Sequence, residues 1–238
     1  AQVLALLDGG LWLDNARAAF AWSAVRDTAP AVTLAPTLSI LLKEDGPAHL
    51  ALLDAVQTLL TERVPVPLRA RVWCEGAFGL PLLRAIEWAT RALDLCRTTG
   101  DARGRYLSLC ALAWSSSMAG QADAAAAAVA EMETAFVPSP ATTAASRGAQ
   151  ARAALAVARG RWEEALQHFR RCAEIWQAAG GSNDRPLHNV IEAELLAGHV
   201  DEAIADGNRL LDRLRGSREI DRLPLPLPDL GPLLADVI

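Results

Sequence analysis

The chain has 238 residues, 52% of them hydrophobic, and a formal net charge of −5, so it can bury a substantial core. Lys43 is its only lysine, and nothing in this acidic composition provides the clustered cations that capture nucleic acid. No apolar run approaches the ~18 residues of a membrane-spanning helix, and no signal peptide is visible. We therefore expect a cytoplasmic protein that contacts neither DNA nor a membrane directly.

Residues 1–63 are expected to form an N-terminal helical segment that matches the later repeats poorly. Pro36 lies inside the apolar stretch "TLAPTLSILL" and should kink or shorten a helix there. A further helix is predicted from Pro47 to Arg63. The sequence "VPVPL" at Val64 then separates this segment from a helix in "LRARVWCEGAFG".

Residues 64–216 repeat. The stretches "MAGQADAAAAAV", "ARGRWEEALQHF" and "LAGHVDEAIADG" share a glycine, then an acidic residue after two positions, then an alanine two positions later. The alanines are Ala125, Ala165 and Ala203, and a weaker member places Ala85 after Gly79, so the steps are 40 (85 to 125), 40 (125 to 165) and 38 (165 to 203). Self-similarity at such a period predicts a solenoid.

Each repeat is predicted to contain two antiparallel helices joined at the glycine, which adopts positive φ (Gly120, Gly160 and Gly198). The alanines should lie where the paired helices cross closely. Glu163 and Glu164, with Trp162 and His168 nearby, could be a catalytic patch. The first turn of a helix explains the carboxylates better, because they favour the positive end of the helix dipole.

Loops are predicted at "TTGDARG" from Thr98, "FVPSPATT" from Phe136 and "AAGGSNDRP" from Ala178. Residues 217–238 form a proline-rich segment, expected to be extended, and the start of a further helix that the chain end truncates. We therefore expect an excerpt of a longer protein. No strand-like alternation occurs, so the predicted fold class is all-α.

The repeated glycine, acidic residue and alanine resemble the tetratricopeptide repeat, although its usual unit is ~34 residues. The longer spacing resembles repeats of bacterial transcription regulators built on a STAND-type ATPase, including LuxR-class relatives of the maltose regulator. Three phrases carry this resemblance: "LDNARAAFAWSA", "PLRARVWCEGAFG" and "RALDLCRTTGDARGRYLSLCALAW". Gly207 and Arg152 depart from it, standing where a bulky core residue and an inward-packing residue are usual. A period near 40 also suits HEAT-type helix pairs.

The resemblance implies a right-handed superhelical solenoid whose first helices line a concave groove. Counting back from the glycines, it implies that the groove is lined by Arg71, Cys74, Cys110, Trp114, Ser117, Arg147, Gln150, His188, Asn189 and Glu192. Large apolar and polar groups that converge in this way are typical of binding sites. The alternative is that these residues only solvate an unused surface.

The sequence carries no recognisable catalytic motif. It has no phosphate-binding loop, no nucleophile elbow or zinc-protease motif, and four irregularly spaced cysteines without a CxxC pair. We expect no cofactor and no metal. Three hypotheses remain: the sensor or protein-interaction region of a regulator whose ATPase and DNA-binding modules lie elsewhere in the chain, a stand-alone tetratricopeptide adaptor, and an unrecognised enzyme.

Overall fold

A computed structural model describes residues 11–42, 46–140, 142–178 and 184–216. Every regular element in this part of the chain is an α-helix, which confirms the all-α fold class. None of the described helices is long and apolar enough to cross a membrane. The helices are α2 (Leu11–Arg26), α3 (Thr28–Leu41), α4 (Gly46–Leu59), α5 (Val66–Ala77), α6 (Leu82–Thr99), α7 (Ala102–Met118), α8 (Ala122–Ala135), α9 (Thr143–Ala158), α10 (Trp162–Ala178), α11 (Asp184–Ala197) and α12 (Val200–Gly216).

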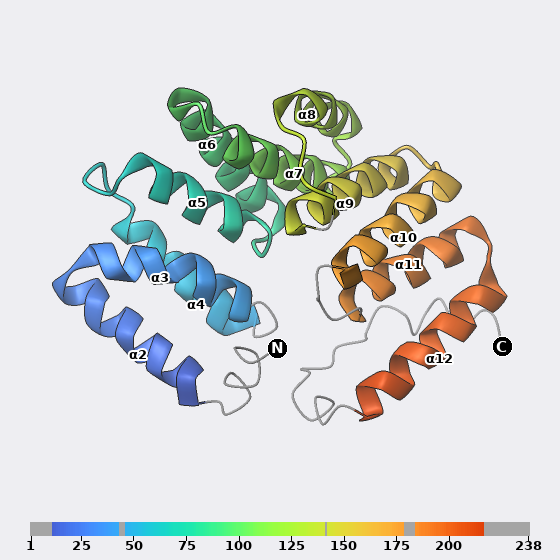
Figure 1. Cartoon of the computed structure of the whole chain (residues 1–238), viewed down its shortest axis with the longest axis horizontal. Helices are drawn as coiled ribbons and strands as arrows, with labels where there is room; N and C mark the ends of the chain where they lie inside the picture. Colours follow the sequence, from blue (N-terminus) through green and yellow to red (C-terminus); the bar gives the residue numbers. More distant parts are fainter. Residues whose placement is uncertain (1–10, 43–45, 141, 179–183, 217–238) are drawn as a thin grey trace.

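The helices follow one another around an arch, with α2 and α12 at its two ends (Figure 1). From α5 to α8 each helix packs against the next, and the same holds from α9 to α12. The two runs are joined chiefly by close packing of α7 against α9. The buried side chains accordingly form several clusters along the arch rather than one central core. The right-handed superhelix remains a prediction.

Three joints between helices have the geometry that the repeats predict. Gly120, Gly160 and Gly198 have φ values of 73°, 67° and 83°. At Gly160 the chain closes α9 with two hydrogen bonds, Gly160 N to Val157 O at 2.9 Å and Arg161 N to Ala156 O at 2.9 Å. This left-handed cap satisfies carbonyls that the helix end leaves free. The prediction for these three glycines is confirmed.

The alanines that mark the repeats are all buried, with exposed fractions of 3% or less (Ala85, Ala125, Ala165 and Ala203). Such burial is what a close helix crossing requires. Glu163 and Glu164 lie in the first turn of α10, as predicted from the helix dipole.

The weaker repeat differs from the other three at its glycine. Gly79 is not among the described residues with positive φ. A Cβ atom at this position would instead collide with the imidazole of His49. His49 is buried in α4 and hydrogen-bonds through Nε2 to Ser39 Oγ at 2.7 Å. Glycine is therefore needed at position 79 for close approach to α4 rather than for a left-handed turn.

Two predictions about the N-terminal helices can be compared with the structure. α3 contains Pro36 and still runs to Leu41, so the proline does not shorten it. The predicted helix from Pro47 to Arg63 begins one residue earlier and ends at Leu59. The predicted segment 217–238 lies outside the described residues.

Candidate functional site

Arg147 is the most unusual of the predicted groove residues. It lies in the second turn of α9, which begins where Thr142 Oγ accepts a hydrogen bond from Ala145 N at 3.3 Å. Its guanidinium carbon sits 3.8 Å from the ring centroid of Phe78, just after α5, a cation–π contact. The side chain is half-buried and forms no hydrogen bond or ion pair with any residue that the structure describes.

Helices α5 and α7 bring the thiols of Cys74 and Cys110 close to Arg147 of α9. Burial lowers the pKa of Arg147, while Glu75 and the thiols of Cys74 and Cys110 raise it. Burial also raises the pKa of Cys110 to about 12, although Arg147 opposes the shift. These thiols stay protonated at neutral pH, and they are therefore poor nucleophiles.

Three predicted groove residues do not face an open surface. Cys74, Cys110 and Ser117 are 4%, 0% and 5% exposed, so their expected position along an accessible groove is wrong. Cys110 and Ser117 are covered because α7 packs against α5, α6, α8 and α9, and Cys74 is covered because α5 packs against α3, α6 and α7. The small side chains allow the helices to approach one another.

Trp114 is half-buried and contributes to packing. Its ring centroid lies 6.5 Å from that of Phe169 at an interplanar angle of 79°, and it packs against the buried cluster shared by α9, α10 and α11. Such an edge-to-face pair stabilises helix packing. Gln150 is half-buried in α9, and Arg71 is exposed on α5.

The last three predicted residues lie on α11. His188 and Glu192 are exposed and Asn189 is half-exposed. α11 packs mainly against α10 and α12, without the extensive contact to α9 that α7 makes. The structure thus brings together Cys74, Cys110 and Arg147, and a single surface reaching from Trp114 to His188 stays a prediction.

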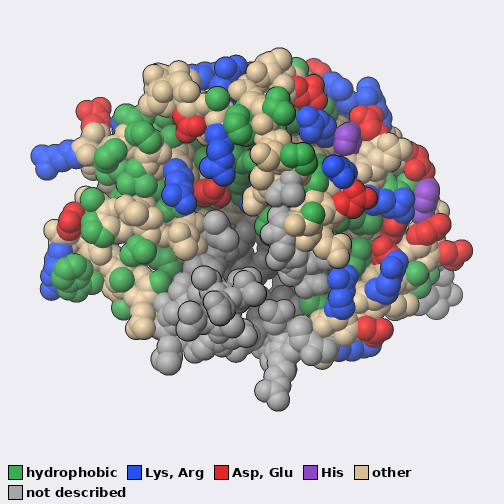
Figure 2. Space-filling model, viewed as in Figure 1, with side chains coloured by type: hydrophobic (Ala, Val, Ile, Leu, Met, Phe, Trp, Pro, Cys, Tyr) green, Lys and Arg blue, Asp and Glu red, His purple; other side chains and the backbone are tan. Residues whose placement is uncertain are grey.

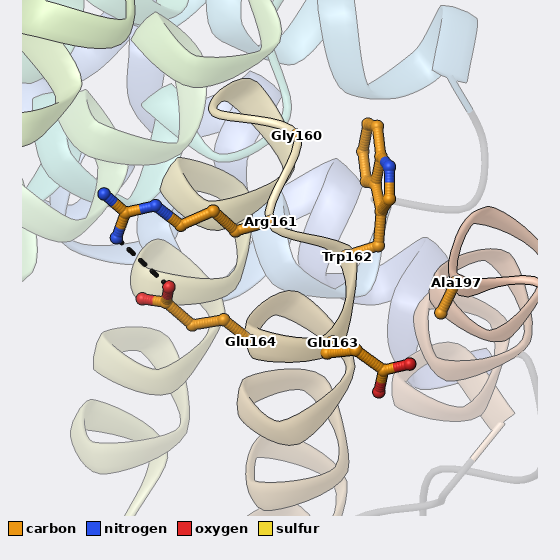
Figure 3. Close-up of a pocket in the computed structure, with 6 residues that line it drawn as sticks. All are labelled: Gly160, Arg161, Trp162, Glu163, Glu164 and Ala197. Atoms are coloured by element: carbon orange, nitrogen blue, oxygen red, sulfur yellow. Dashed lines mark hydrogen bonds and ion pairs between the residues drawn. The ribbon is translucent and has the colours of Figure 1, made fainter.

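The joint at Gly160 borders an open hollow of about 400 Å³. In Figure 3 the indole of Trp162 points away from the ion pair of Arg161 and Glu164, and Glu163 projects toward the side of Ala197. Glu164 lies 3.2 Å from Arg161, and Glu163 lies 2.7 Å from Nε2 of His199. The carboxylates therefore diverge toward different partners, which favours a structural joint over a catalytic patch.

The sequence prediction missed a second hollow beneath residues 136–140, which follow α8. Its ionisable lining includes Arg152, Arg171, His168 and Glu133. The departure at Arg152 from the repeat pattern was the only signal for it. No group of three or more metal-binding side chains occurs within the described residues.

Comparison with known proteins shows only the fold. No protein-family model matches the chain, and no curated protein matches it. The chain is similar in structure to BtubC (BKLC) from P. vanneervenii, with a TM-score of 0.57 and 15% sequence identity over 87% of this chain and 91% of that chain. The similarity supports an all-helical fold along most of the chain.

Proposed function

We propose that this chain is the non-catalytic, tetratricopeptide-like sensor and protein-interaction region of a larger cytoplasmic regulator. It binds an inducer or a partner protein in a concave groove lined by the first helix of each repeat, and it signals occupancy to ATPase and DNA-binding modules elsewhere in the full-length protein. A ligand that binds two curvatures of the arch with different affinity shifts their populations by that difference.

The proposal rests on the environment of the Arg147 guanidinium. It is half-buried, held over Phe78 and without an ion-pair partner among the described residues. A guanidinium in such a site gains more from a carboxylate than an exposed one does, because water screens it less. An acidic or carboxylate-bearing partner therefore suits this surface.

The proposal can be tested by panning a library of random peptides against the purified chain. Arg147→Gln should lose the enriched acidic sequences, whereas the control Arg159→Gln, at the exposed end of the same helix, should keep them. Equal enrichment on both variants contradicts the proposed site. The purified chain should also neither turn over ATP nor retain duplex DNA at physiological salt.

The alternative is a stand-alone tetratricopeptide adaptor that uses the same surface. The repeated joints favour both functions equally, since each needs only a scaffold of stacked helices. The sequence of the full-length gene product separates them: an ATPase module in the same chain supports the regulator, and none supports the adaptor.

A further inference from the structure

The hollow lies beneath residues 136–140, which follow the end of α8. α8 ends at Ala135, and Pro138 and Pro140 keep the following residues from extending it. At the joints of Gly120, Gly160 and Gly198 two or three residues separate the helices, whereas seven residues separate α8 from α9. The hollow has a volume of about 540 Å³, within the ~300–1,000 Å³ of small-molecule sites.

The wall of the hollow is apolar. Phe136 packs edge-on against Tyr106, with ring centroids 5.9 Å apart. Val137 is 85% exposed, and Ile175 of α10 completes this side. When an apolar ligand group covers an exposed valine beside aromatic and aliphatic side chains, removing that surface from water lowers the free energy.

The rim of the hollow carries two guanidinium groups and one carboxylate. Arg152 and Arg171 face it with His168, and Glu133 is its one acidic lining residue. Arg152 Nε donates to Glu133 Oε1 at 3.1 Å, so its remaining guanidinium N–H groups can serve another acceptor. Arg171 pairs with Glu174 at 3.0 Å, and both side chains are largely exposed.

Arg152 also acts on His168. Burial lowers the pKa of His168, Arg152 lowers it further, and Glu164 and Glu133 oppose the shift. Arg171 faces the same hollow from α10. His168 is therefore neutral at pH 7, and an anion bound beside it would raise its pKa.

The hollow is separate from the proposed groove. Ala145, Ala149 and Arg152 line the hollow and recur at helical spacing on one stripe of α9. At about 100° per residue, Arg147 and Gln150 fall on the opposite side of that helix. A ligand could therefore occupy the hollow while a partner occupies the groove.

We propose that this hollow binds a small amphipathic anion, an aromatic or branched aliphatic acid. Its acidic group lies between Arg152 and His168, and its apolar body lies on Phe136, Val137 and Ile175. The guanidinium donors on the rim and the apolar wall match the two ends of such a molecule. The inference does not depend on the proposed function, which concerns the other side of α9.

The test uses 8-anilinonaphthalene-1-sulfonate, an aromatic anion whose fluorescence rises at an apolar site. Arg152→Gln should weaken its binding by at least about tenfold. Glu133→Gln should tighten binding severalfold, because it removes the carboxylate that competes for Arg152. Arg159→Gln, at the C-cap of the same helix, is the matched control and should leave the dissociation constant unchanged. Circular dichroism checks the folding of each variant.

A second readout separates charge from simple apolar adsorption. The His168 ring protons, followed by NMR, should show a higher pKa with the anion bound and no shift with the uncharged N-phenyl-1-naphthylamine. Equal dissociation constants for Arg152→Gln and Arg159→Gln, or an unchanged His168 pKa at saturation, would overturn the proposal.

Discussion

The centre of the arch and its C-terminal helix use glycine in opposite ways. Gly148 is buried in α9, and a Cβ there would collide with the hydroxyl group of Tyr106 on α7. Gly207 lies inside α12, and a Cβ there would meet nothing within 4 Å. Glycine at position 148 thus allows two helices to pack closely, whereas glycine at position 207 is not required by any close contact.

The surfaces of the two regions differ as well. α12 leaves Ile204 and Leu211 exposed by 54% and 43%. Figure 2 shows charged side chains of both signs crowded over the half of the arch that contains α10–α12. The α7–α9 contact, by contrast, is made by small buried residues such as Cys110 and Ala151. We therefore expect substitutions in the two regions to change the free energy of unfolding by different amounts and, for glycine, in opposite directions.

The largest effect is expected for Ala165→Leu. Ala165 is fully buried at the start of α10, so the larger side chain should cost near the top of the ~1–3 kcal/mol typical of overpacking. Ala203→Leu, the equivalent change in α12, should cost less. Urea unfolding measures both, and an unchanged midpoint for Ala165→Leu would show that this crossing tolerates bulk.

Gly148→Ala should destabilise the fold by about 1–2 kcal/mol, because steric overlap with Tyr106 outweighs the gain in helix propensity. Thermal unfolding measures the change. The double variant with Tyr106→Phe removes the hydroxyl group and should recover part of the loss. No recovery would mean that the cost arises elsewhere.

Gly207→Ala should stabilise the chain by about 0.5–1 kcal/mol, because alanine restricts the unfolded backbone and favours the helix. A rise in melting temperature is the expected result. A fall would show that position 207 is packed and would remove the contrast with Gly148.

The smallest effect concerns pH. The pKa of His168 is lowered in the folded protein, first by burial and then by Arg152, so the unfolded chain binds a proton more readily. The contribution of neutral His168 to the free energy of unfolding is fully present above about pH 6.5. It is lost as the pH falls toward the pKa of His168 in the folded protein. His168→Gln should flatten that acid loss in urea titrations, and an identical pH profile in both proteins would contradict it.

The candidate site could be predicted only in part. Counting from the joint glycines predicted that Arg147, Gln150 and Trp114 line a groove, and the structure leaves these three side chains half-buried on α7 and α9. The same counting also assigned Cys74 and Cys110 to an open surface, because one helix's register says nothing about how many neighbours cover it. The hollow beside Arg152 escaped prediction for a related reason, since its lining comes from four separate segments.

The sequence alone determined the helices, the joints and the burial of the repeated alanines. These depend on local physics: positive φ at Gly160, carboxylates at a helix start and the 3.6-residue period. Tertiary structure alone decided that Gly79 faces His49 and that Arg147 lies over Phe78. Those contacts join residues 30 and 69 positions apart (79 − 49 and 147 − 78), and only the packing of one helix against another brings them together.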